Sequence, residues 1–169
     1  MVSGARATTQ SRLDGATALK ARFDAAAGGP QLLALVSPTC EVCLDGVSTV
    51  LSGLDEPAGG AFIAHIVWIP VLEGDTGDVA AAVARDRRSS RVEHYWDDTA
   101  SLSRAAHAAL GLAAWDRTVA WDVYLLYPSG VSWSNPLPSP KMWLHQLRIE
   151  DQPSLDADSL RSAMQALTR

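Results

Sequence analysis

Continuous apolar runs alternate along the chain with segments in which apolar side chains recur every three or four positions. The runs over 31–36 and 61–72 predict buried strands, because a strand covered on both faces loses the alternation of polar and apolar residues. Helical spacing of apolar residues predicts helices over the following ranges: 13–23, 44–54, 78–88, 101–110 and, beginning near Ser154 or Asp156, the segment up to Leu167.

The last third of the chain has a different pattern. A short strand is predicted over 91–96, and the apolar segments 121–127 and 131–133 flank Pro128-Ser129-Gly130, which is typical of a strand, turn and strand hairpin. A proline-rich loop follows over 135–140. The elements therefore alternate between helix and strand up to a hairpin and a final helix. This order predicts an α/β fold with a mostly parallel central sheet, helices on both faces and an antiparallel hairpin at one side.

Length and composition fit one globular domain. The chain has 169 residues, of which 47% are hydrophobic and 20% charged, so it can bury a core without staples. We expect a flexible N-terminal segment over 1–12 and a single domain over 13–169. The formal net charge of -5 gives no reason to expect a nucleic-acid partner.

The N-terminal segment has no apolar core of the length that a secretory signal needs, and no later segment is apolar enough to span a bilayer. The sequence thus predicts a cytoplasmic protein that does not associate with membranes. In a reducing cytosol, two cysteines separated by two residues are more typical of catalysis or metal binding than of a structural disulfide.

Cys40 and Cys43 are the only cysteines, and they follow the predicted strand 31–36 directly. If the residues after that strand begin a helix, both sulfurs lie where backbone N–H groups converge and negative charge is favoured. The spacing also allows the sulfurs to join as a disulfide. Cys43 shares a helix face with Val47 and Val50, so we expect it to be buried and Cys40 to be the exposed, attacking thiol.

A strand, a CxxC that opens a helix, a long central strand, an inserted helix-strand-helix unit and a hairpin together resemble the thioredoxin-like superfamily, in particular its TlpA-like and peroxiredoxin branch. The resemblance implies a central mixed sheet of about five strands flanked by helices on both faces. It also implies thiol-disulfide exchange, with Cys40 as the nucleophile and Cys43 as the resolving thiol, and with Pro38, Thr39 and Trp121 as substrate-binding positions. No cofactor is expected, and the partner would be a protein or small-molecule disulfide or thiol.

Three positions depart from the family pattern. Thr39 replaces the aromatic residue that commonly precedes the first cysteine, and Ala34 stands where thioredoxin carries a carboxylate, so no buried proton acceptor comes from that position. Trp121 falls at the place of the family's cis-proline. A cis bond before a residue other than proline costs about 3 kcal/mol, which favours a trans peptide there.

Two alternatives follow from the same residues. Cys40 and Cys43, helped by His145, have the donor atoms for a soft metal such as copper or zinc, and a chain that has lost its activity would be a catalytically silent interaction domain. Of the other histidines, His65 lies within the apolar run 61–72, which favours a hydrogen-bonded residue of the core.

Overall fold

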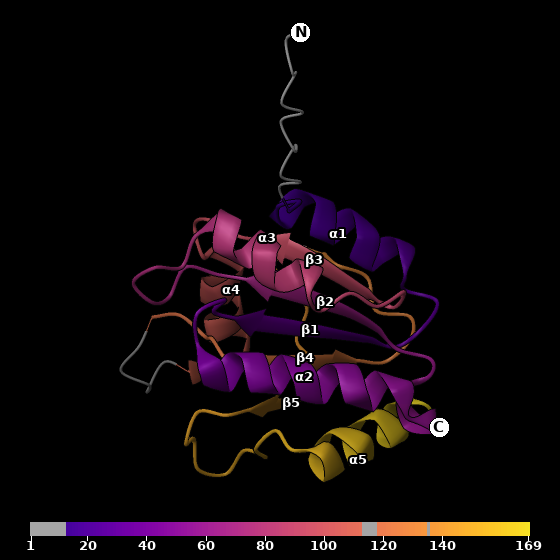
Figure 1. Cartoon of the computed structure of the whole chain (residues 1–169). Helices are drawn as coiled ribbons and strands as arrows, with labels where there is room; N and C mark the ends of the chain where they lie inside the picture. The colour runs from indigo at the N-terminus through magenta and orange to yellow at the C-terminus, as the bar shows by residue number, and fades with distance from the viewer. Residues whose placement is uncertain (1–12, 113–117, 135) are drawn as a thin grey trace, which may run out of the picture.

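The computed structural model describes residues 13–112, 118–134 and 136–169, so the expected flexible segment 1–12 lies outside the described residues. Figure 1 shows the arrangement of the helices and strands. In chain order they are α1 (Ala16–Ala25), β1 (Gln31–Val36), α2 (Glu41–Asp55), the 3-10 turn η1 (Pro57–Gly59), β2 (Ile63–Trp68), α3 (Gly77–Arg85), β3 (Val92–Trp96), α4 (Ser101–Ala109), β4 (Val123–Tyr127), β5 (Met142–His145) and α5 (Ala157–Leu167).

The five strands form one mixed sheet in the order β3-β2-β1-β4-β5. β1 pairs in parallel with β2 and β2 with β3, whereas β4 runs antiparallel to β1 and β5 antiparallel to β4. The carboxyl end of central β1 therefore lies beside the amino end of β4, which in turn lies beside the carboxyl end of β5. Chain segments that are far apart in the sequence meet at this edge.

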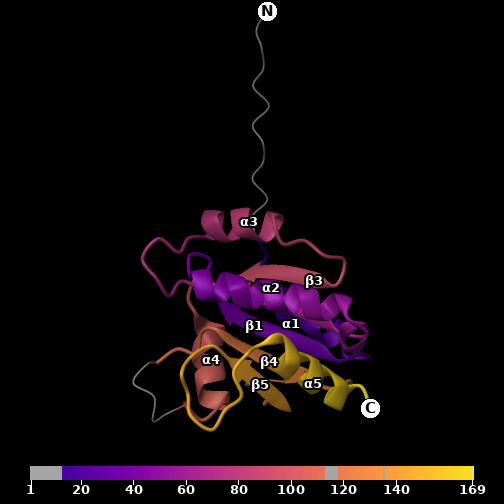
Figure 2. The same ribbon diagram turned by 60° about the horizontal axis from the view of Figure 1, so that its bottom comes forward.

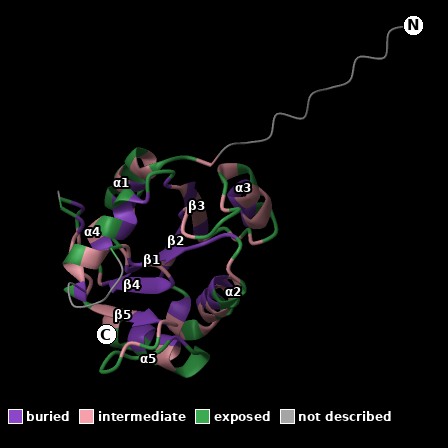
Figure 3. Cartoon of the chain, turned by 90° about the vertical axis from the view of Figure 1, so that its left-hand side faces the viewer, coloured by how far each residue is buried: buried purple, intermediate pink, exposed green. Residues whose placement is uncertain are grey.

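Helices cover both faces of the sheet, as Figure 3 shows in an end-on view. Leu32, Ala34 and Val36 of β1 point into a core cluster with residues of α2, α3 and α5. Leu33 and Leu35 point into a second cluster with residues of α1 and α4. The continuous apolar run of β1 is explained by this burial on both faces. The predicted α/β fold with a five-stranded sheet between helices is confirmed.

Helices α3 and α5 lie at opposite edges of the sheet but cover the same face of it. Figure 2 shows α5 beside β4 and β5, and α3 over β3 at the opposite edge. Asp156 caps α5 by accepting the backbone N–H of Ser159 at 2.7 Å, close to the predicted start of that helix. None of the helices within the described ranges has the length and apolar character needed to cross a lipid bilayer.

The prediction that 131–133 forms the second strand of the hairpin is wrong. The partner of β4 is β5, which the proline-rich segment separates from that turn. Trp133 is buried instead against α1, with its ring 5.5 Å from that of Phe23 in an edge-to-face contact. Its backbone N–H donates to the carboxylate of Asp24 at 2.6 Å. The bulk of the indole is used for packing on the helix rather than for pairing in the sheet.

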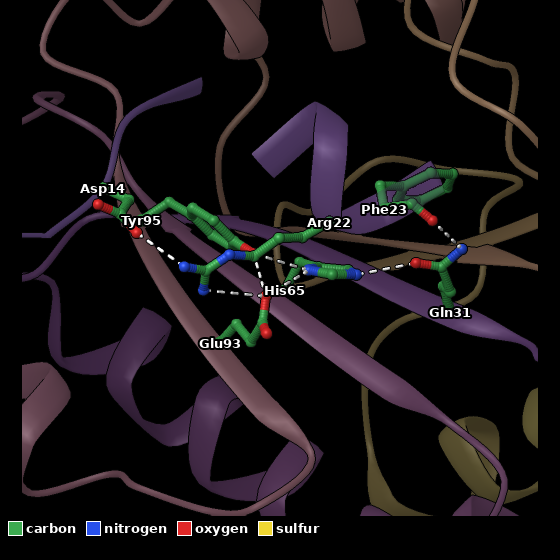
Figure 4. A network of polar contacts seen from close by, with 7 residues as sticks. All are labelled: Asp14, Arg22, Phe23, Gln31, His65, Glu93 and Tyr95. Atoms are coloured by element: carbon green, nitrogen blue, oxygen red, sulfur yellow. Dashed lines mark hydrogen bonds and ion pairs between the residues drawn. The ribbon is translucent and has the colours of Figure 1, made fainter. Parts of the chain in front are cut away.

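His65 of β2 is fully buried in a network of polar side chains between the sheet and α1 (Figure 4). Its Nε2 lies 2.8 Å from Oε1 of Gln31, and its Nδ1 lies 3.3 Å from the hydroxyl of Tyr95. The amide of Gln31 donates to the backbone carbonyl of Phe23 at 3.0 Å, and Tyr95 donates to the carboxylate of Glu93. The prediction of a hydrogen-bonded core histidine is confirmed.

This network makes stability depend on pH. Burial lowers the pKa of His65 from 6.5 to about 4. Between these values the unfolded chain binds a proton at His65 that the folded protein does not. The contribution of His65 is therefore complete above pH 6.5 and is lost by about 1.4 kcal/mol per pH unit as the pH falls toward 4.

We expect His65→Gln, which keeps a neutral hydrogen-bonding side chain, to flatten the fall in unfolding free energy between pH 6.5 and pH 4. Urea unfolding of the wild type and the variant across this range measures the pH dependence of the unfolding free energy of each protein. The other titrating groups contribute equally to both, so the difference between the two curves reports on His65. Parallel curves for the two proteins would show that His65 is not the group responsible.

Candidate active site

Cys40 and Cys43 lie at the junction of β1 and α2. β1 ends at Val36, a short turn follows, and α2 begins at Glu41 with Cys40 as its N-cap residue. The Sγ of Cys40 accepts the backbone N–H of Cys43 at 3.3 Å. The sulfur therefore faces the unpaired N–H groups of the first helical turn, an environment that favours negative charge.

The two sulfurs differ in accessibility. Cys40 is partly exposed, whereas Cys43 is fully buried, because its face of α2 packs with Val47 and Val50 against the sheet. Both thiols are free, and the backbone hydrogen bond from Cys43 to the Cys40 sulfur holds the two residues together. A partner from solvent can thus reach Cys40, and Cys43 lies within reach of Cys40.

A carboxylate from the loop before α3 holds the turn that leads to Cys40. Asp75 accepts hydrogen bonds from the hydroxyls of Ser37 at 3.0 Å and Thr39 at 2.6 Å. Its other oxygen accepts the backbone N–H groups of Val71 at 2.9 Å and Leu72 at 2.8 Å. Partial burial raises the pKa of Asp75, but these hydrogen bonds outweigh it and lower the pKa below its ordinary value. The ionised carboxylate therefore ties the two loops together.

The three residues that the sequence predicts to contact substrate have different surroundings. Pro38 is buried, whereas Thr39 is exposed and uses its hydroxyl to bind Asp75. Trp121 is half-buried and packs against both core clusters. It comes just before β4, whose amino end lies beside the carboxyl end of β1. Their contact with a substrate stays a prediction.

Exposed apolar side chains accompany the cysteines. Val42, between the two cysteines, is 50% exposed, and Leu72 is 40% exposed. Asp75 connects the Leu72 loop to Thr39, the residue before Cys40. Both apolar side chains therefore lie on segments that border the reachable sulfur or are tied to it.

A polar cluster of buried Asp122 and Tyr124 with half-buried Gln146 lies near Cys43. Asp122, directly before β4, is 2% exposed, and its carboxylate accepts the hydroxyl of Tyr124 at 2.9 Å. Gln146 follows β5, and its side-chain amide donates to the same carboxylate at 2.8 Å and to the backbone carbonyl of Val42 at 2.9 Å. The antiparallel pairing of β4 with β1 and β5 brings these residues to the cysteines.

The charges in this cluster influence one another. Burial raises the pKa of Asp122 to about 6, although the hydrogen bond from Tyr124 acts in the opposite direction. Burial also raises the pKa of the Cys43 thiol, and the charge on Asp122 raises it further. The carboxylate of Asp122 is therefore close enough to affect the ionisation of the Cys43 thiol.

His145 is not brought together with the cysteines. Its Nδ1 accepts the backbone N–H of Leu147 at 2.9 Å, and its Nε2 lies 3.2 Å from the carbonyl oxygen of Gln152. Across 13–112, 118–134 and 136–169, no three or more His, Cys, Asp or Glu side chains are grouped so as to hold a metal ion. The ligand set of Cys40, Cys43 and His145 that the sequence suggested is not assembled.

Sequence reasoning missed the two carboxylates of this site. Asp75 lies between the predicted elements 61–72 and 78–88, and Asp122 lies within the predicted strand 121–127. For Asp122 a signal existed, since a charged residue stands directly before the five apolar residues of β4. Asp75 is a short polar residue in a turn, and nothing in its neighbourhood indicates that it binds Thr39.

Comparison with solved structures identifies the fold. A secreted Mycobacterium tuberculosis disulfide oxidoreductase, described as homologous to E. coli DsbE, matches with a TM-score of 0.52 and 12% identity over 83% of each chain. A thioredoxin-like protein whose solution structure was determined in the oxidised form matches with a TM-score of 0.50 and 13% identity, over 82% of this chain and 78% of the other. No protein-family model and no curated protein matches the sequence.

The chain therefore has a thioredoxin-like fold, as the resemblance implied. The first of these neighbours is a disulfide oxidoreductase by its description. In the present chain the same fold carries two neighbouring free thiols, one of them reachable from solvent.

Proposed function

We propose that this protein is a thiol-disulfide oxidoreductase whose redox centre is the pair Cys40 and Cys43. The observation that carries the proposal is the asymmetry of the pair. The partly exposed sulfur of Cys40 caps α2 and accepts the backbone N–H of Cys43, whose own thiol is buried. This arrangement supports attack by one sulfur on a partner and release by the other.

In the reductive direction, the thiolate of Cys40 attacks a substrate disulfide and forms a mixed disulfide, and the first substrate thiolate leaves. Cys43 loses its proton and attacks the sulfur of Cys40. The Cys40–Cys43 disulfide forms, and the second substrate thiolate leaves. Two electrons pass from the protein to the substrate, and the reverse sequence oxidises a substrate dithiol.

The partner that we propose is a protein or small-molecule disulfide or thiol, and the cycle needs no organic cofactor. The exposed Val42 and Leu72 support contact with an apolar partner surface beside the reactive sulfur. The cytoplasmic location expected from the sequence stays a prediction. The similar disulfide oxidoreductase of Mycobacterium tuberculosis is described as secreted.

A disulfide-reduction assay tests this function. With insulin as substrate and dithiothreitol as the electron source, we expect the wild type to accelerate reduction and Cys40→Ser to fall to the rate of dithiothreitol alone, because its remaining thiol is buried. Ser48→Ala, an exposed change on the same helix, is the matched control and should keep full activity. Equal rates for wild type and Cys40→Ser would disprove the proposal.

A further inference from the structure

Asp122 is a buried carboxylate without a cationic partner. It is 2% exposed, and the ion pairs formed within the described ranges do not include it. A buried charge that lacks a counterion is costly, and such groups are concentrated at functional sites.

The backbone and two side chains fix the position of this carboxylate. Asp122 has a positive φ of 55°, a conformation that Asp and Asn tolerate better than most residues. Its N–H donates to the carbonyl of Leu35 at 2.7 Å, beside the end of β1. Tyr124 and Gln146 donate to the carboxylate, and the second hydrogen bond of Gln146 reaches the carbonyl of Val42, the neighbour of Cys43.

The buried surroundings of Asp122 and Cys43 favour one negative charge over two. While Asp122 is ionised, a thiolate at Cys43 would place a second negative charge close to it in a buried environment, and this is why the carboxylate raises the pKa of the thiol. Transfer of the Cys43 proton to Asp122 would keep the number of buried charges at one. The thiolate could then form without the cost of a second charge.

We propose that Asp122 is the proton acceptor for Cys43 when that thiol attacks the mixed disulfide on Cys40. This inference rests on the proposed function and assigns a base to its second step. The carboxylate comes from the residue directly before β4, whereas the β1 position at which thioredoxin carries a carboxylate is Ala34 in this chain.

The proton moves from Sγ of Cys43 to the carboxylate of Asp122, and the sulfur electron pair of Cys43 forms a bond to Sγ of Cys40. The bond between Cys40 and the substrate sulfur breaks, and the substrate leaves as a thiolate. That thiolate or water then takes the proton from Asp122, which returns to its ionised form.

The second step should depend on pH through Asp122. Because burial raises its pKa to about 6, Asp122 is increasingly protonated below that pH and can no longer accept a proton. The titratable groups that interact with it are Tyr124 of β4 and Cys43 of α2. Gln146 is uncharged, and the ring nitrogens of His145 are engaged with Leu147 and Gln152.

A rapid-mixing experiment with one equivalent of an aryl disulfide that releases a coloured thiolate separates the two steps. The first release reports attack by Cys40, and the second reports resolution by Cys43. In Asp122→Asn we expect an unchanged first phase and a second phase slowed by about a hundredfold at pH 7. The wild-type inflection near pH 6 should be absent, and the deficit should shrink at alkaline pH, where hydroxide removes the proton. Asp45→Asn, an exposed carboxylate on α2, is the control and should behave as the wild type.

The outcomes separate this proposal from the function on which it rests. A wild type that releases no second thiolate would contradict the oxidoreductase proposal itself. A normal second phase in Asp122→Asn, with the inflection still present, would overturn the role of Asp122 alone. If Asp122→Asn does not fold, Tyr124→Phe tests the role of Asp122 instead. Loss of its hydrogen bond should move the inflection to a higher pH, and an unmoved inflection would overturn the proposal.

Discussion

Replacing Cys43 by serine should trap the protein in a covalent complex with its substrate. Cys40 remains exposed at the N-cap of α2 and can still attack a disulfide, but the hydroxyl of serine cannot displace the bound thiol under mild conditions. Serine is close to cysteine in size, so the packed core around position 43 is retained. We expect turnover to fall to background, while a one-to-one mixed disulfide accumulates.

Intact-protein mass spectrometry measures this result as a mass increase equal to one substrate thiol, which dithiothreitol should remove. Cys40→Ser is the matched control. Its remaining thiol is fully buried, so it should form no adduct with the folded protein. Continued turnover in Cys43→Ser, or an adduct of equal yield on Cys43 in the control, would contradict the assigned order of attack.

Replacing Gly46 by alanine should destabilise the protein by about 2 kcal/mol. A Cβ at this position of α2 would lie 1.9 Å from the hydroxyl oxygen and 2.8 Å from Cζ of Tyr124. Alanine gains about 1 kcal/mol over glycine in a helix, but overpacking costs about 1–3 kcal/mol. Displacing Tyr124 also weakens its hydrogen bond to Asp122, which contributes about 1.5 kcal/mol or more for a charged acceptor. The costs of overpacking and of the weakened hydrogen bond therefore exceed the gain in helix propensity.

Urea unfolding of Gly46→Ala measures this effect, with Ser52→Ala at an exposed position of the same helix as the control for helix propensity. Adding Tyr124→Phe to Gly46→Ala removes the oxygen that clashes and should recover part of the lost stability. If Gly46→Ala is at least as stable as the wild type, the close packing of Tyr124 against α2 does not contribute to the stability of the fold.

Sequence reasoning predicted correctly those parts of the fold in which consecutive residues are all buried. β1 is buried at every position, so its apolar run has a single interpretation. The partner of β4 was missed because β5 has only four residues and follows a long connection, whereas Val131 and Trp133 offered an alternating pattern next to a turn. That pattern reflects packing of Trp133 on Phe23 and not strand pairing.

The features of the candidate site also fall into those that the local sequence reveals and those that it does not. The spacing of Cys40 and Cys43, and the helix face of Cys43, are local properties that can be found in the sequence. The contacts of Asp122 are not, because they depend on the order of strands in the sheet and on a side chain that follows β5. Ala34 correctly indicated that β1 supplies no carboxylate, but it gave no sign that Asp122 lies near Cys43.

A redox titration of the wild type in glutathione buffers, with the free thiols trapped by alkylation at each potential, tests directly whether Cys40 and Cys43 act as a redox pair. We expect one two-electron transition in which Cys40 and Cys43 lose their free thiols together and form an internal disulfide. Two thiols that stay free across the range, or a glutathione adduct on Cys40 with no Cys40–Cys43 bond, would contradict it.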